Sequence, residues 1–227
     1  MKKLILGAFA VTVAVGVFAQ GQVALVGNSA SGTQHIWGPS ITAPTLSLVG
    51  SGSNDHNPTP GTTPYAASGM SLIGSSGLFG PGGAATTLAQ LLAAPGANAP
   101  DNLLVPSGQT TTFRTGRPAG LTFILTDVLE NVPIDAPAVT LEVVAWDNSS
   151  GQYPTWATAS AAWEAGLIDA GMSGSFTVND VGGFLNTPPV FAYNSFNLYY
   201  VPEPSTFALA GLGAAAVLTF RRRKPGA

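Results

Sequence analysis

The chain contains no cysteine among its 227 residues. Without thiols it can form no disulfide, present no thiol nucleophile and bind no metal or cluster through cysteine. Its stability must therefore come from the burial of apolar groups or from a bound ion.

Charged side chains are also scarce, at 8% of the chain against about 25% in an average soluble domain. Six of the eight basic residues lie at the two ends, which leaves only Arg114 and Arg117 between them. All eleven acids fall in that central part, whose formal charge is therefore about −9. Two cations cannot neutralise a run of phosphates, so the composition argues against nucleic-acid binding.

Histidine occurs only twice, at His35 and His56, and the two residues have no metal-ligand spacing. Neither a GxSxG nor an HExxH sequence is present. We therefore expect no catalytic residues, no metal site and no enzymatic activity.

Residues 1–19 have the pattern of a secretory signal peptide. Two lysines follow the initiator methionine, and the apolar stretch after them is uncharged. Small residues stand at the −3 and −1 positions, so we predict that signal peptidase cleaves between Ala19 and Gln20. The alternative is an uncleaved anchor helix, which the short apolar stretch disfavours.

The other end of the chain has three parts in a row. Pro202, Glu203 and Pro204 form a short extended unit, because each proline fixes φ and disfavours helix in the residue before it. Residues 206–220 follow as an apolar helix of roughly 21 Å, against ~30 Å of hydrocarbon, which suits a transient anchor in the inner membrane. A basic cluster then stops transfer and keeps the end in the cytoplasm. It consists of Arg221, Arg222, Arg223 and Lys224.

This tail closely resembles the PEP-CTERM sorting signal of diderm bacteria, through PEPST, the helix containing LAGLGAAAV and the closing RRRK. The resemblance implies recognition by an exosortase, a membrane cysteine protease-transpeptidase, and delivery to the cell surface or to an exopolysaccharide matrix. A plain C-terminal anchor is the alternative. A GPI signal would end without a basic stop, and no LPxTG-like motif is present. The chain then divides into a signal peptide at 1–19, an ectodomain at 20–200 and a sorting signal at 201–227.

The ectodomain is predicted to be mainly β, an antiparallel β-sandwich or jelly roll with one or two short helices. Short apolar segments alternate with turns rich in glycine, proline and asparagine, among them a loop at 54–64. The clearest strand is residues 138–146, AVTLEVVAW, which alternates well, with Val139, Leu141, Val143 and Ala145 on one face. The other expected strands are residues 23–26, 46–49, 70–73, 110–114, 120–128, 174–178 and 195–201.

Two segments are predicted to be helices. Residues 86–94, TTLAQLLAA, end at a Pro-Gly pair. Residues 155–166 are rich in alanine and have no internal proline or glycine. The residues expected on one face of the second helix are Trp156, Ala159, Trp163 and Leu167.

Residues 117–200 are also similar to the C-terminal halves of many PEP-CTERM ectodomains. The similar segments are VTLEVVAWDNSSG, WATASAAWEAG, GSFTV, GGFLNTPP and SFNLYYVPEP. The resemblance implies a common surface module and brings no catalytic residues with it.

Two site chemistries compete with this interpretation. Glycoside hydrolysis needs paired carboxylates, and the candidates are Asp127, Glu130, Asp135 and Glu142. Calcium binding would use the oxygen-rich turns at 101–102, 147–148 and 179–180. Acids and amides near turns more often cap the backbone or face solvent, so we expect neither, and calcium is kept as the weaker alternative.

Aromatic side chains offer one further surface. Tyr153 and Trp156 border a turn and are the expected contacts if the domain binds a glycan. The sequence thus predicts an exported cell-surface or matrix protein of unknown specific activity, sorted by an exosortase. The alternative is a carbohydrate-binding protein of the exopolysaccharide matrix, with a carbohydrate-cleaving one as the further variant.

Overall fold

The computed structural model describes residues 20–25, 28–29, 32–50, 64–75, 83–123 and 125–202. The predicted signal peptide, nearly all of the expected loop at 54–64, and the sorting signal from Glu203 onward lie outside these residues. Among the residues described, no helix is long and apolar enough to cross a membrane. The predicted helix at 206–220 belongs to the part that is not described.

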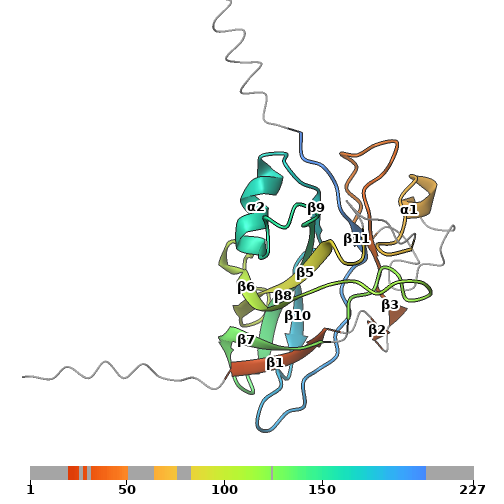
Figure 1. Ribbon diagram of the computed structural model, residues 1–227. Coiled ribbons are helices and arrows are strands. Elements are labelled where there is room, and N and C mark those ends of the chain that lie inside the picture. The colour runs from red at the N-terminus through yellow and green to blue at the C-terminus, as the bar shows by residue number, and fades with distance from the viewer. Residues whose placement is uncertain are drawn as a thin grey trace, which may run out of the picture.

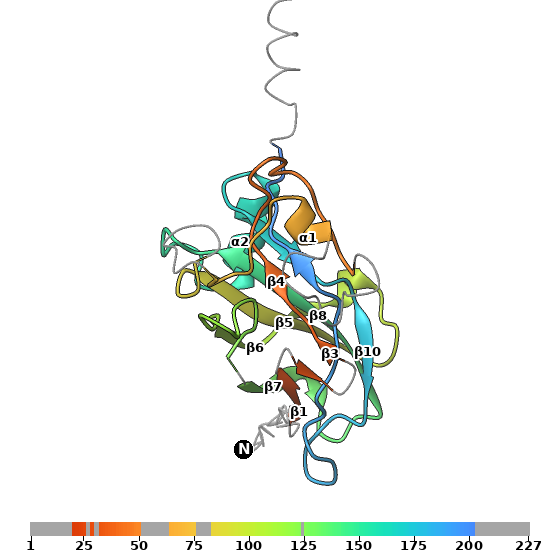
Figure 2. The ribbon, with the colours of Figure 1, turned by 90° about the vertical axis from the view of Figure 1, so that its right-hand side faces the viewer.

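A five-stranded sheet forms the centre of the domain (Figures 1 and 2). Its order is β10-β8-β5-β6, and β9 also pairs with β8. All of these pairings are antiparallel, and nine residue pairs join β5 to β8. The strands are β5 (Thr87–Pro95), β6 (Val105–Thr111), β8 (Ala138–Asp147), β9 (Ala170–Met172) and β10 (Phe176–Asn179).

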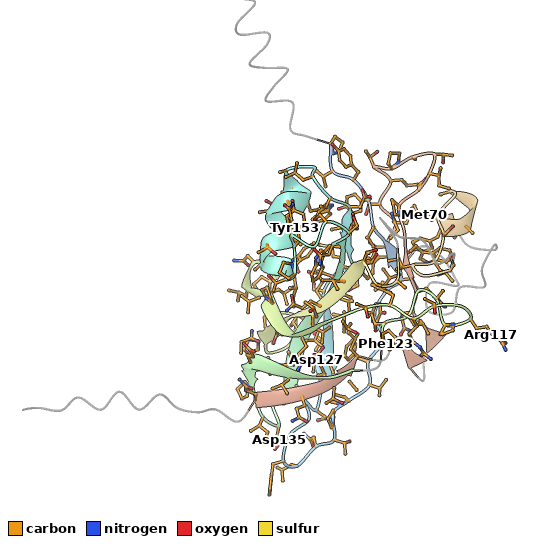
Figure 3. The ribbon with its side chains drawn as sticks, viewed as in Figure 1. Met70, Arg117, Phe123, Asp127, Asp135 and Tyr153 are labelled. Carbon is orange, nitrogen blue, oxygen red and sulfur yellow. The ribbon has the colours of Figure 1, made fainter. Side chains whose placement is uncertain are left out.

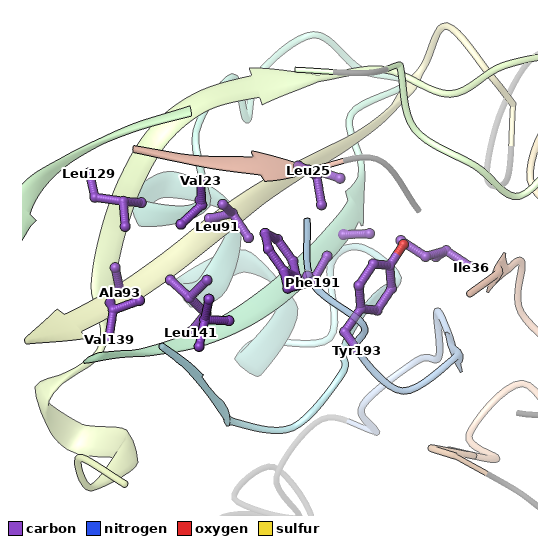
Figure 4. Packing of buried hydrophobic residues seen from close by; sticks show 14 of the residues in the cluster. Val23, Leu25, Ile36, Leu91, Ala93, Leu129, Val139, Leu141, Phe191 and Tyr193 are labelled. Carbon is purple, nitrogen blue, oxygen red and sulfur yellow. The ribbon is translucent and has the colours of Figure 1, made fainter. Parts of the chain in front are cut away.

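A second layer covers one face of this sheet. It consists of β1 (Gln20–Leu25) and β7 (Leu125–Pro133), which pair antiparallel. Figure 4 shows side chains of both strands meeting those of β5 and β8, with Phe191 and Tyr193 between them. This apolar interior is the main core. The prediction of a mainly β domain with few short helices is confirmed, and the two layers are consistent with a β-sandwich.

The other face of the sheet carries the helix α2 (Trp156–Glu164). Strict alternation along β8 sends Val144 and Trp146 to this side, where they pack with Trp156 and Trp163 of the helix. The helix predicted at 155–166 is thereby confirmed, with Thr155 at its N-cap position. Leu167, expected on the same face, is instead exposed beyond the end of the helix.

Shorter elements complete the domain beside these layers. The strand β4 (Ile36–Trp37) pairs in parallel with β11 (Phe196–Asn197), a departure from the all-antiparallel expectation. The remaining elements are β2 (Asn28–Ser29), β3 (Gly32–Thr33), α1 (Pro64–Ala67) and the 3-10 helix η1 (Asp101–Leu103).

The helix predicted at 86–94 is wrong, because this segment forms the central strand β5. Alanine, leucine and glutamine favour helix locally, but β5 lies between β8 and β6 and is buried almost throughout. A short continuous apolar run fits a doubly covered strand as well as a helix. Here the backbone pairing with two neighbours overrides local propensity.

Several expected strands are displaced or reduced. The strands near 110–114 and 120–128 occur as β6 and β7, shifted along the chain. The segments 46–49 and 70–73 make only isolated bridges, at Val49 and Leu72. Among the described residues, the partner of each segment is a two-residue strand, β11 for Val49 and β4 for Leu72, which is too short to support a regular ladder.

Candidate functional site

The chain leaves the domain along a short segment that we call the strap, residues 199–201. The backbone N–H of Tyr199 donates to the carbonyl of Ala170 at 2.9 Å, and the N–H of Ala170 donates back to Tyr199 at 3.3 Å. The N–H of Tyr200 donates to the carbonyl of Pro44 at 2.8 Å. The strap is thus fastened to β9 on one side and to the loop around Pro44 on the other.

Side chains fasten the strap as well. The indole N–H of Trp163 donates to the carbonyl of Tyr199 at 3.0 Å, and the two rings meet edge to face with centroids 5.1 Å apart. Val201 packs against the same group of residues. We refer to the connected rings as the aromatic cluster, which consists of Trp146, Trp156, Trp163 and Tyr199.

The predicted sorting residues begin directly after the strap. Pro202 is exposed at the end of the described chain. In Figures 1 and 2 this exit lies at one end of the domain, beside the turn that follows α2. Glu203, Pro204 and the basic cluster 221–224 lie outside the described residues, as does Ala19. Gln20 is described, and it is the first residue of β1.

The two residues expected to contact a glycan occupy different environments. Trp156 is 6% exposed, and its ring lies between those of Trp146 and Trp163. Tyr153 is half-buried, and its carbonyl accepts a hydrogen bond from the indole of Trp146 at 2.7 Å. Of the two residues, Tyr153, labelled in Figure 3, is the one that is partly exposed, and the glycan contact stays a prediction that depends on it.

Asp127 is a carboxyl group inside the main core. Its Oδ1 accepts the backbone N–H of Gln109 at 2.9 Å, whereas its Oδ2 is buried with no hydrogen-bond partner. Gly108 closes over it, since a Cβ at that position would lie 2.7 Å from Asp127 Cγ. Desolvation raises the pKa of Asp127 to about 6, partly offset by the hydrogen bond from Gln109.

Glu142 is a second buried carboxyl, on β8. Desolvation and then the nearby charge of Asp101 raise its pKa to about 7. Glu142 alternates with Val144 and Trp146 and so faces the α2 side of the sheet, while Asp127 is on β7, in the layer that covers the opposite face, beside Gly108 and Gln109 of β6. These two candidates are therefore not brought together as a facing pair.

The remaining candidates, Glu130 and Asp135, lie at the surface, and Asp135 has a structural role that the sequence did not indicate. Its carboxylate accepts the backbone N–H groups of Phe184, Leu185 and Asn186 at 3.0–3.1 Å. The hydrogen bond from Asn186 is the largest cause that lowers the pKa of Asp135. The loop so held presents Phe184 and Leu185, 87% and 79% exposed, at the end opposite the C-terminal exit (Figures 1 and 3).

No group of three or more histidine, aspartate or glutamate side chains suited to a metal occurs among the described residues. His35 has a buried Nδ1 without a partner, and desolvation lowers its pKa to about 4. In the turn at 147–148, the carboxylate of Asp147 accepts from Ser149, and the Asn148 amide oxygen accepts from the N–H of Tyr153. These oxygens accept hydrogen bonds within their own turn, and the absence of a bound cofactor stays the prediction, with calcium as the weaker alternative.

A comparison with protein families finds one match. Residues 201–224 match the family model of the PEP-CTERM protein-sorting motif. No curated protein and no solved structure matches the chain. The matched segment starts at Val201, within the strap, and includes the proline pair, the apolar stretch and the basic cluster identified in the sequence. The chain is therefore a protein with a C-terminal PEP-CTERM sorting signal, a type of signal that exosortases process in secreted proteins.

Proposed function

We propose that this chain is a non-enzymatic protein of the cell surface or extracellular matrix. It is exported with the signal peptide 1–19, held briefly in the inner membrane by the helix 206–220, and delivered by an exosortase that reads Pro202, Glu203 and Pro204. The observation that carries the proposal is the sorting motif at 201–224, which directly follows the folded domain.

The arrangement of the ectodomain supports a role without catalysis. Its candidate carboxylates are separated by the central sheet or lie at the surface. A glycosidase would instead need two carboxyl groups about 5 Å or 6.5–9.5 Å apart in a shared cleft.

Carbohydrate binding in a matrix is the alternative function. It has less support, because Trp156 is enclosed by other aromatic rings and only the half-buried Tyr153 remains as an expected contact.

The experiment is the intact mass of the protein recovered from its own host. We expect a chain that begins at Gln20 and has lost its apolar tail. Glu203→Ala removes the carboxylate between the two prolines, so it should leave export unchanged and the tail in place. Glu130→Ala, the same substitution at an exposed position of the ectodomain, is the matched control and should be processed normally. Normal tail removal in Glu203→Ala would contradict the assignment of the motif.

A further inference from the structure

The strap uses the same backbone groups that a sorting enzyme would have to bind. Proteases and related peptide-binding proteins commonly take their substrates as extended strands, through hydrogen bonds to the substrate backbone. In the folded domain, both the N–H and the carbonyl of Tyr199 are bonded, to Ala170 and to the indole of Trp163. The N–H of Tyr200 is bonded to Pro44. The backbone groups immediately before the sorting residues are therefore already hydrogen-bonded within the domain.

No linker separates the domain from the sorting signal. Val201 is both the first residue of the matched motif and a member of the group packed around the aromatic cluster. Four residues, 202–205, lie between it and the predicted membrane helix, and even fully extended they span only about 14 Å. An enzyme at the outer face of the membrane must therefore approach the motif right beside the folded domain.

The chain just before the strap, at Asn197, packs tightly against β9. Gly171 of β9 lies against the carbonyl of Asn197, so closely that any Cβ at residue 171 would collide with it. Asn197 in turn bonds the backbone of Leu46 and Leu48 through its side-chain amide. Detachment of the chain from Tyr199 onward leaves these contacts in place, so the strap can open without unfolding of the domain.

We propose that the docked strap and the exosortase compete for the same chain, so that tail removal proceeds from the state in which residues 199–201 are detached from Ala170 and Trp163. This regulation rests on the proposed function, because it concerns the same sorting signal. Folding of the ectodomain outside the membrane then slows release of the tail, and the stability of the strap sets the rate.

The first test compares two matched substitutions in the full-length chain, expressed in a host that has the exosortase. Trp163→Phe removes the indole N–H that bonds Tyr199 and should accelerate tail removal about threefold to tenfold, through a larger detached population. Trp146→Phe is the same substitution in the same cluster, but the indole bond that it removes ends at the carbonyl of Tyr153 and not at the strap. It should leave the rate unchanged. The rates of tail removal are measured by pulse-chase labelling with intact mass. Equal acceleration in both variants, or no acceleration in Trp163→Phe, would overturn the proposal.

The second test leaves the domain untouched. Insertion of Gly-Ser-Gly-Ser between Val201 and Pro202 supplies free chain ahead of the motif. Tail removal should then be faster than in the wild type, and Trp163→Phe should add nothing further. The same insertion between Ser150 and Gly151, in an exposed turn, is the control. A rate equal to that of the wild type in the Val201–Pro202 insertion would refute competition by the strap.

A third variant separates the two proposals. Glu203→Ala in the background of the Val201–Pro202 insertion should block tail removal if the motif is read as proposed. Continued removal there would contradict the sorting assignment. The rates of the insertion and of Trp163→Phe would still decide whether the strap limits processing.

Discussion

Both carboxylate oxygens of Asp135 accept the backbone N–H of Leu185, each at 3.0 Å, across 50 residues of sequence. The same carboxylate also binds the N–H groups on either side, at Phe184 and Asn186. One half-buried side chain thus fixes the loop that presents Phe184 and Leu185 to solvent.

The first prediction concerns this loop. Asp135→Asn keeps the size of the side chain but weakens the charge-assisted bonds, so the amides of residues 184–186 should exchange with solvent severalfold faster. Hydrogen exchange with mass spectrometry measures the effect. Asp180→Asn is the control, because it makes the same change in charge. Like Asp135, Asp180 has a positive φ, which is 55°. The hydrogen bonds from the loop lower the pKa of Asp135. The stability that Asp135 contributes to the folded loop should therefore be present at neutral pH and be lost as the pH falls through that lowered pKa.

The second prediction concerns Asp127 and pH. Its pKa is about 6 in the folded domain against 3.8 as a free group, so the folded state binds more protons between these values. The free energy of unfolding should therefore fall as the pH rises from about 4 to 7, by on the order of 2 kcal/mol from this group. Asp127→Asn should remove that part of the fall, as measured by urea unfolding of residues 20–202 at several pH values.

Two further variants check the origin of the pH effect. Glu142→Gln should remove a second part of the fall, at somewhat higher pH, because the pKa of Glu142 is about 7. Glu130→Gln, at an exposed position on the same strand as Asp127, should leave the buried carboxyl groups and the fall intact. A pH dependence that is unchanged in Asp127→Asn would contradict the burial of this carboxylate as a charged group.

The third prediction tests the central strand. Leu91 of β5 is fully buried in the main core, so Leu91→Ala should lower the free energy of unfolding by about 2–5 kcal/mol. Leu103→Ala makes the same truncation at an exposed position and should change it by less than about 0.5 kcal/mol. Similar losses in both variants would show that residue 91 does not lie in the core.

The fourth prediction concerns the isolated ectodomain. Residues 20–202, which include the strap, should fold in solution as a β-rich domain, because both layers and the aromatic cluster are complete within them. Addition of a chelator should leave the thermal midpoint unchanged. A circular dichroism spectrum dominated by helix would contradict the fold, and a lower midpoint with chelator would favour the calcium alternative.

The fifth prediction concerns topology. Replacement of Arg221, Arg222, Arg223 and Lys224 by neutral residues should weaken the stop and let the chain pass through the membrane unprocessed. A reporter fused after Ala227, with tail processing disabled by Glu203→Ala, should be active only on the cytoplasmic side. Periplasmic activity with the basic cluster intact would contradict the orientation.

Structural features that depend on residues close together in the sequence are predicted well. The sorting motif is linear, so its order and spacing identify it directly. The strand β8 carries a visible alternation and the helix α2 an alanine-rich run without proline or glycine, and both elements occur where these local signals place them. The strand β5 has no such pattern because both of its faces are covered, and its type is decided by pairing with residues more than 40 positions away.

The site features that sequence reasoning missed depend on contacts that are distant along the chain. Asp135 was considered as a catalytic candidate, yet its partners lie 49 to 51 residues further on. The link between Trp163 and Tyr199 spans 36 residues. The sequence signal for the contact between Trp163 and Tyr199 is the group of aromatic residues just before the PEP motif. Such residues suit a packed chain end better than a flexible linker.

The way in which the strap is attached also determines how the domain bears mechanical load. A pull on the C-terminal end acts first on Tyr200 and Tyr199, and passes through Ala170 into β9 and then β8, the middle of the sheet. The bond between Tyr200 and Pro44 shares the load with the loop on the other side. A protein held at this end under shear flow would thus yield first at the strap, while its two-layered core stayed intact.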